Sequence, residues 1–112
     1  MKQNTISRIL TEAINILETR GWIQGDIKTG YGFCALGALQ QARKNIYSDK
    51  VEIEVESSEA YWTTKEFVID FIKNSGKGSG IVSWNDTKGR TKDEVIAMFR
   101  EAIKLSQKRC KS

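Results

Sequence analysis

The residues best suited to chemistry or binding are concentrated in residues 83–91, Ser-Trp-Asn-Asp-Thr-Lys-Gly-Arg-Thr. Trp84, Asn85, Asp86 and Arg90 bring an aromatic ring, an amide, a carboxylate and a guanidinium into one short segment. Asn and Asp favour turns because their side chains bond nearby backbone, and Arg90 stands four residues from Asp86, a spacing that favours pairing across the turn. The segment is therefore either a turn that fastens the fold through Trp84 or a pocket for a ligand or partner.

Two further residues join this set. Trp22 follows Gly21 at the end of the first expected helix, and Cys34 lies among Phe33, Ala35 and Leu36. An apolar setting is typical of a small buried thiol, so we expect Cys34 to be buried and Cys110, in a basic tail, to be exposed. The candidate ligand-binding or partner-binding residues are Trp22, Cys34, Trp84, Asn85, Asp86 and Arg90.

Several catalytic and metal sites are excluded by composition. The chain has no histidine and only two cysteines, so Ser-His-Asp and Cys-His sites, histidine-containing zinc sites and a Cys₄ zinc site cannot form. Acid–base catalysis needs a positioned partner group, and the sequence places none beside Asp86. We predict no catalytic residue, no metal and no cofactor; a small hydrolase-like enzyme that uses Asp86 is kept as an alternative.

The net charge of +4 comes entirely from residues 57–112. The basic residues of the last expected helix and tail are Lys104, Lys108, Arg109 and Lys111. Cations at a helix C-terminus complement the helix dipole, which is the structural interpretation. The same residues are the basis of a second functional hypothesis, a nucleic-acid-associated protein. The glycine-rich run 76–80 lacks the spacing of a phosphate-binding loop and is interpreted as a connector.

Length and hydropathy indicate one soluble domain. The 112 residues fit a single domain, 1–112. No apolar run approaches the roughly 20 residues that a membrane helix needs, and no secretory signal is visible. We expect a cytoplasmic protein with no membrane association; the oligomeric state does not follow from the sequence.

Apolar periodicity and helix-boundary residues predict four helices. The expected ranges are 5–20, 33–45, a segment between 58 and 74, and 91–107. Gly21 is suited to end the first helix, while Thr91 and Glu94 have the spacing of a capping box at the start of the last. Thr63 and Glu66 have the same spacing, so the strong part of the third helix is expected from Thr64.

Strict alternation over residues 51–56, Val-Glu-Ile-Glu-Val-Glu, predicts a strand. Residues 81–84, Ile-Val-Ser-Trp, are its natural antiparallel partner. The expected fold is therefore mainly α, a single compact domain of about four helices with one short β-hairpin; an α+β fold is the alternative.

Three motifs carry a resemblance to a known family: Gly21-Trp22, the C-x-x-GA segment at 34–38, and Trp84-Asn85-Asp86 followed by Arg90-Thr91 and Glu94-Val95. The chain resembles an uncharacterised family of small bacterial and phage proteins over most of its length, except about 45–80. The resemblance implies a small, largely helical cytoplasmic domain and no assigned activity. The shared residues are Trp22, Cys34, Gly37, Ala38, Trp84, Asn85, Asp86, Arg90 and Thr91.

These residues suggest a shared corner between the two ends of the chain. Trp22 and Trp84 are expected to bracket the start of the second helix, where Asn85 and Asp86 bond backbone amides that a helix N-terminus leaves open. The leading functional hypothesis is a non-enzymatic binding module, phage-encoded, that acts on a host protein as an inhibitor or sequesters a small ligand. Exposed aromatic side chains around Tyr61, Trp62 or Trp84 would mark its binding surface.

Overall fold

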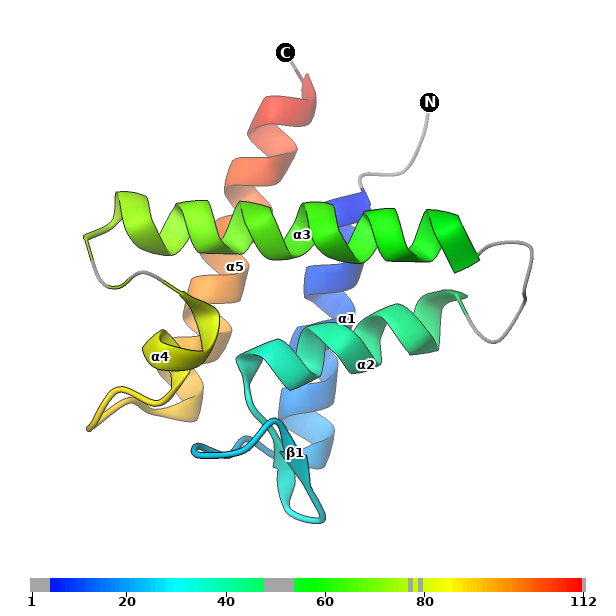
Figure 1. The fold of residues 1–112 in the computed structure, drawn as a ribbon. Coiled ribbons are helices and arrows are strands. Elements are labelled where there is room, and N and C mark those ends of the chain that lie inside the picture. The colour runs from blue at the N-terminus through cyan, green and yellow to red at the C-terminus, as the bar shows by residue number, and fades with distance from the viewer. Residues whose placement is uncertain (1–4, 48–53, 77, 79, 112) are drawn as a thin grey trace.

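Two long amphipathic helices from opposite ends of the chain pack against each other. In the computed structural model, α1 (Thr5–Arg20) and α5 (Lys92–Lys111) lie side by side, and α3 (Glu54–Asn74) crosses both (Figure 1). The second helix, α2 (Ala35–Tyr47), packs on α1 and α3. The structure describes residues 5–47, 54–76, 78 and 80–111, and of 54–57 and 109–111 only the backbone.

The predicted boundaries of the first and last helices are confirmed at their capped ends. Gly21 follows α1 with φ of 102°, a conformation that side-chain-bearing residues rarely adopt. At α5, the Thr91 backbone N–H donates to Glu94 Oε1 (3.0 Å), and the Glu94 N–H donates to Thr91 Oγ1 (3.2 Å). This reciprocal pair is the predicted capping box, and α5 continues beyond the expected residue 107 to Lys111.

The predicted pairing of strands 51–56 and 81–84 is wrong. Residues 54–56 begin α3, residues 51–53 lie outside the described residues, and residues 81–84 belong to a short helix, α4 (Ile81–Asn85). The period of an apolar run this short does not separate helix from strand, and here helix α4 buries Ile81 and Trp84. Thr64 is also not near a helix start: it lies inside α3, fully buried, and donates to the Ala60 carbonyl.

A short β-hairpin is present, but between the first two helices. Strands β1 (Lys28–Thr29) and β2 (Gly32–Phe33) pair antiparallel, so Phe33, expected to begin the second helix, lies in a strand, and that helix runs over Ala35–Tyr47 instead of 33–45. The mainly helical fold with one short hairpin is thus confirmed, with five helices among the described residues. The loop before α2 approaches that helix closely at Gly37, because a Cβ there would clash with the Ile27 carbonyl oxygen.

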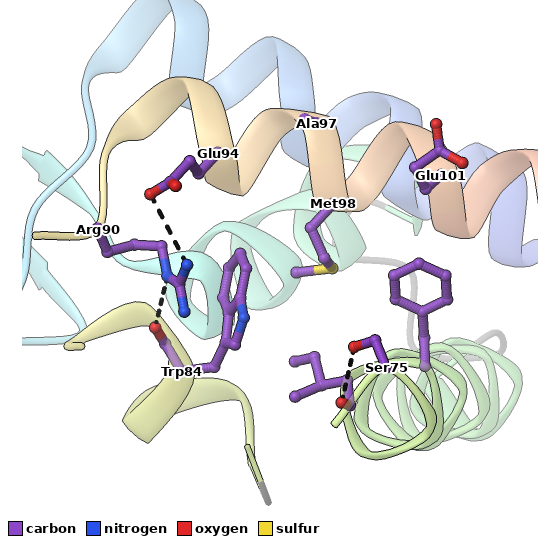
Figure 2. A pocket seen from close by; sticks show the side chains of 9 residues that line it. Ser75, Trp84, Arg90, Glu94, Ala97, Met98 and Glu101 are labelled. Atoms are coloured by element: carbon purple, nitrogen blue, oxygen red, sulfur yellow. Dashed lines mark hydrogen bonds and ion pairs between the residues drawn. The ribbon is translucent and has the colours of Figure 1, made fainter. Parts of the chain in front are cut away.

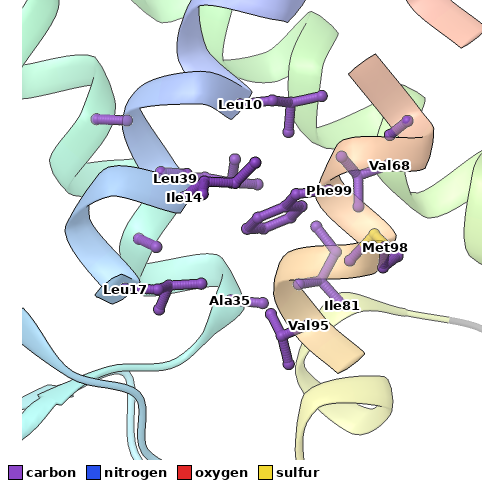
Figure 3. Close-up of a cluster of buried hydrophobic side chains, with 14 of the residues drawn as sticks. Leu10, Ile14, Leu17, Ala35, Leu39, Val68, Ile81, Val95, Met98 and Phe99 are labelled. Carbon is purple, nitrogen blue, oxygen red and sulfur yellow. The ribbon is translucent and has the colours of Figure 1, made fainter. Parts of the chain in front are cut away.

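The core fills the space enclosed by these helices. Phe99 of α5 is fully buried and lies among side chains of α1, α2 and α3, including Leu10, Leu39 and Val68 (Figure 3). Every one of these side chains comes from an element that the periodicity of the sequence predicted as a helix. Among the described residues, no helix is both long and apolar enough to cross a bilayer.

Candidate functional site

Asn85, the last residue of α4, is the centre of a buried polar cluster. Its Oδ1 accepts hydrogen bonds from the Trp22 indole Nε1 (2.6 Å) and from the Ala35 backbone N–H (2.9 Å). Its Nδ2 donates to the Ile23 carbonyl (3.1 Å) and to Asp86 Oδ1 (3.0 Å). We call Asn85 with these four partners the Asn85 cluster. Since Ala35 is the first residue of α2, Asn85 bonds an open amide at that helix start, as the sequence predicted.

The chemistry of the partners fixes which way the Asn85 amide faces. An indole N–H and a backbone N–H can only donate, and the Ile23 carbonyl can only accept. The amide oxygen must therefore face Trp22 and Ala35, and the nitrogen must face Ile23. Asn85 is 0% exposed, and its oxygen and nitrogen each have two partners, so its side chain offers nothing to a ligand.

The neighbouring loops are joined by three further hydrogen bonds. Gln24 Nε2 donates to the carbonyls of Asn85 (2.9 Å) and Thr87 (3.0 Å), and the Gly25 N–H donates to Asp86 Oδ1 (3.0 Å). Asp86 thus bonds a loop amide rather than the α2 start expected from the sequence. The sequence did not single out Gln24 and Gly25, because nothing in their local pattern distinguishes them from ordinary loop residues.

Cys34 is buried beside this cluster and caps α2. Its Sγ accepts the Gly37 N–H (3.4 Å), the position at which a Ser or Thr hydroxyl usually caps a helix. The side chain is 1% exposed, which confirms the expected buried thiol. Burial raises the pKa of the Cys34 thiol, and the nearby Asp86 carboxylate contributes in the same direction. A buried thiol held in its neutral form is a poor nucleophile.

Trp84 and Arg90 contact each other. The Arg90 guanidinium carbon lies 3.9 Å from the centre of the Trp84 ring, and Nε donates to the Trp84 carbonyl (3.0 Å). Arg90 also lies 3.7 Å from Glu94 (Nη1 to Oε1), so the predicted pairing of Arg90 with Asp86 is wrong. The turn that begins at Asp86 directs Arg90 back over the indole ring, where the cation–π contact holds it.

Trp84 and Arg90 form one wall of an open groove between α3, α4 and α5. The groove has a volume of about 280 Å³, and its apolar lining is formed mainly by Phe71, Ile72, Trp84 and Met98. Figure 2 shows Met98 extending from α5 toward the space between Trp84 and the Ser75 end of α3. We call this space the α3–α5 groove. Trp84 is only 4% exposed, so little of its ring is open to the groove.

A second hollow adjoins the α3–α5 groove. It has a volume of about 220 Å³ and shares Phe71 and Ser75 with the first. Phe67, Asp70 and Leu105 contribute to its lining. Phe67, Phe71 and Met98 lie in segments that the sequence predicted as helices, but apolar periodicity gives no sign that they border a hollow. We call this space the Phe67 hollow.

The remaining predicted site residues whose side chains are described line neither the α3–α5 groove nor the Phe67 hollow. Lys104 Nζ lies 3.7 Å from Glu101, and Lys108 is exposed, while the side chains of Arg109, Cys110 and Lys111 lie outside the described residues. Of the aromatic residues expected to mark a binding surface, Trp62 is 54% exposed with Lys65 stacked on its ring, at 4.5 Å. Among the described residues, His, Cys, Asp and Glu form no group of three or more that could hold a metal ion.

Comparison with known proteins places the chain in a family. Neither the curated proteins nor the solved structures compared with the chain gave a match. The sequence pattern of one protein family matches residues 1–105, nearly the whole chain. The match includes all three motifs on which the resemblance rested, together with the intervening residues 45–80. The chain belongs to this family, DUF6197, which is described as a family of unknown function.

Proposed function

We propose that this protein is a non-enzymatic binding module and that its α3–α5 groove receives an apolar group of a partner protein. The observation that carries the proposal is the groove itself, an apolar hollow walled by Phe71, Trp84 and Met98 beside the charged side chains of Arg90 and Glu94. Concave apolar surfaces with a few polar groups at the rim are the usual form of a binding site.

The size of the groove favours a protein side chain over a free small molecule. Pockets for drug-sized ligands are roughly 300–1,000 Å³, and the α3–α5 groove holds about 280 Å³. A volume just below this range suits one large side chain projecting from a partner. Sequestration of a small ligand is therefore the less favoured form of the proposal.

The Asn85 cluster is not a competing binding site, and this supports the assignment of the groove. Asn85 is completely buried and fully bonded, so the pair Asn85 and Asp86 does not form an open site at which both side chains could act on a substrate. Neither residue lines the α3–α5 groove or the Phe67 hollow. A hydrolase-like reaction at Asp86 has no supporting geometry, and we do not propose one.

The cellular setting of the proposal rests on motif resemblance. The likeness to small bacterial and phage proteins suggests a protein that acts in the bacterial cytoplasm, as an inhibitor of a host protein if it is phage-encoded. The nucleic-acid alternative rests on the charge of the C-terminal helix. Its test is a titration with single-stranded and duplex DNA and RNA at about 50 mM salt, where electrostatic binding is strong.

The groove is tested with amino-acid fragments that stand in for a partner's side chain. N-acetyl amides of tryptophan, phenylalanine and leucine are titrated while backbone amide shifts are followed by NMR. We expect dissociation constants of about a millimolar, because a fragment with few atoms gains little binding free energy. The shifts should cluster at Phe71, Trp84 and Met98.

Two matched variants decide whether the shifts report the groove. Ala97 is an exposed groove-lining residue of α5, so Ala97→Trp should fill the groove and abolish the shifts. Asn15→Trp adds the same side chain at an exposed position of α1 that does not line the groove and should leave them unchanged. Absence of clustered shifts in the wild type, or shifts that persist in Ala97→Trp, would overturn the proposal.

A further inference from the structure

The charges around the two hollows differ from those of the chain as a whole. The chain carries a net charge of +4. The charged residues that line the α3–α5 groove and the Phe67 hollow are three carboxylates and one guanidinium: Asp70, Glu94, Glu101 and Arg90. These linings are therefore acidic on a basic protein, and this local excess is what a partner docked there would meet.

The single cation of the lining is already engaged. Only 13% of the Arg90 side chain is exposed, and its guanidinium lies over the Trp84 ring and bonds the Trp84 carbonyl. The side chains of Glu94 and Glu101 are 53% and 62% exposed. Glu94 Oε1 lies 3.7 Å from Arg90 Nη1, and Glu101 Oε2 lies 3.7 Å from Lys104 Nζ. In both pairs the carboxylate is at the surface, where a partner's cation can join or replace the pair at little cost. The carboxylates, not the guanidinium, are thus accessible.

The two hollows are each suited to one apolar side chain. They hold about 280 and 220 Å³, and Phe71 and Ser75 border both. A partner seated on them would place two neighbouring side chains on either side of Phe71. Recognition by adjacent apolar anchors with charged residues at the rim is a general mode of binding for short protein segments.

We propose that the partner is a protein segment with two large apolar side chains flanked by lysine or arginine. Its apolar side chains occupy the α3–α5 groove and the Phe67 hollow, and its cations lie beside Asp70, Glu94 and Glu101. This inference rests on the proposed function of the groove and adds to it the chemistry of the partner. An acidic apolar segment fits the hollows equally well but is repelled by the carboxylates, and a neutral one gains no attraction from them.

The experiment compares three synthetic peptides that share one sequence framework, and each carries the same fluorescent label. The first has two phenylalanines four residues apart with three flanking lysines; the second has glutamates in place of the lysines; the third keeps the lysines and replaces one phenylalanine with alanine. Binding is measured by fluorescence anisotropy at about 20 and 200 mM salt, concentrations between which surface attraction is progressively screened.

We expect the lysine peptide to bind about tenfold more tightly than the glutamate peptide at the lower salt concentration, since each exposed charge pair contributes a few-fold. Its advantage should shrink at the higher salt concentration, and the single-anchor peptide should bind more weakly than the first. The overall charge of +4 would by itself favour the glutamate peptide. A preference for lysine therefore reports the local carboxylates.

Charge-neutral variants test which carboxylates produce the preference for the lysine peptide. Glu94→Gln keeps an oxygen for the capping box, so the combination of Glu94→Gln and Glu101→Gln should remove most of the lysine preference without loss of fold. Glu59→Gln, an exposed position of α3 outside both hollows, should leave the preference intact. Thermal unfolding of each variant checks that the fold is retained.

The outcomes separate this inference from the function on which it rests. Equal binding of the lysine and glutamate peptides, a preference that survives in the Glu94 and Glu101 double variant, or no loss on removing one anchor overturns the basic two-anchor partner. Peptides that fail to bind while the fragment shifts persist also overturn it and leave the groove as a binding site. Failure of the fragments in the groove overturns the proposed function.

Discussion

The Asn85 cluster and the α3–α5 groove are formed by consecutive residues of one short helix and have opposite chemistry. In the cluster, Asn85 is buried and both its oxygen and its nitrogen have two protein partners. In the groove, apolar atoms border an open hollow and two of the nearby carboxylates are half-exposed. Adjacent residues serve the two regions: Asn85 faces the cluster and Trp84 faces the groove. A polar residue in a motif can thus hold the fold while its neighbour borders the surface available to a partner.

The comparison predicts that the largest loss of stability follows from removing the Asn85 amide. Asn85→Leu would leave the Trp22 indole N–H, the Ala35 N–H and the Ile23 carbonyl without their partner. Each unsatisfied buried group costs roughly 1–3 kcal/mol, so we expect about 3 kcal/mol or more from urea unfolding. Asp86→Asn, an exposed change that keeps the oxygen, should cost under about 1 kcal/mol. Similar losses in the two variants would contradict the assignment of the cluster.

A substitution at Gly37 tests how closely the loop before α2 packs on that helix. In an exposed helix, Gly→Ala stabilises by about 1 kcal/mol. At Gly37 the added Cβ would clash with the Ile27 carbonyl, so we expect Gly37→Ala to destabilise by about 1–3 kcal/mol instead. Lys44→Ala, at an exposed position of the same helix, should be nearly neutral. Stabilisation by Gly37→Ala in thermal unfolding would show that the loop does not press on α2.

Cys34 is expected to make a smaller contribution to the free energy of unfolding, and this contribution depends on pH. Its folded-state pKa is raised, so the neutral thiol is favoured in the folded protein. The resulting stability is present below the unfolded-state pKa, about 8.5 for a free thiol, and is lost as the pH rises through the folded-state value. Between about pH 8 and pH 10.5, the free energy of unfolding should fall more in the wild type than in Cys34→Ala. Equal slopes, or rapid alkylation of native Cys34 by iodoacetamide at pH 8, would argue against a buried neutral thiol.

The smallest stability effect is expected in the groove, where the functional effect should be largest. Ala97→Trp changes an exposed position and should alter the free energy of unfolding by no more than about 0.5 kcal/mol. The same variant is expected to lose binding of the amino-acid fragments. Chemical denaturation and the NMR titration on one sample measure both quantities. A large stability loss in Ala97→Trp would mean that the groove is part of the packed core.

The parts of the fold that follow from local pattern were predictable. The ends of α1 and α5 follow from apolar periodicity, Gly21 and the capping box of Thr91 and Glu94. The segment 81–84 was mispredicted because a short apolar run fits a strand and a buried helix equally well. Its helical form depends on Trp84 and Ile81 entering a core built by distant elements.

Only part of the candidate site could be predicted from the sequence. The types of Trp22 and Asn85 indicated a polar corner, and the structure joins them by a hydrogen bond across 63 residues of sequence. The groove could not be predicted in this way. Phe71 and Met98 have the spacing of ordinary core residues, and whether such a residue borders a hollow depends on how far α4 covers α3 and α5.

The hydrogen bond from the Ala35 amide to Asn85 has a consequence for hydrogen–deuterium exchange. The first amide of a helix normally has no partner within the helix and exchanges quickly with solvent. The Ala35 amide can exchange only when the Asn85 side chain withdraws from it, by rotation of that side chain or by separation of α4 from the start of α2. Its protection factor is therefore a single-residue reporter of how often this contact opens.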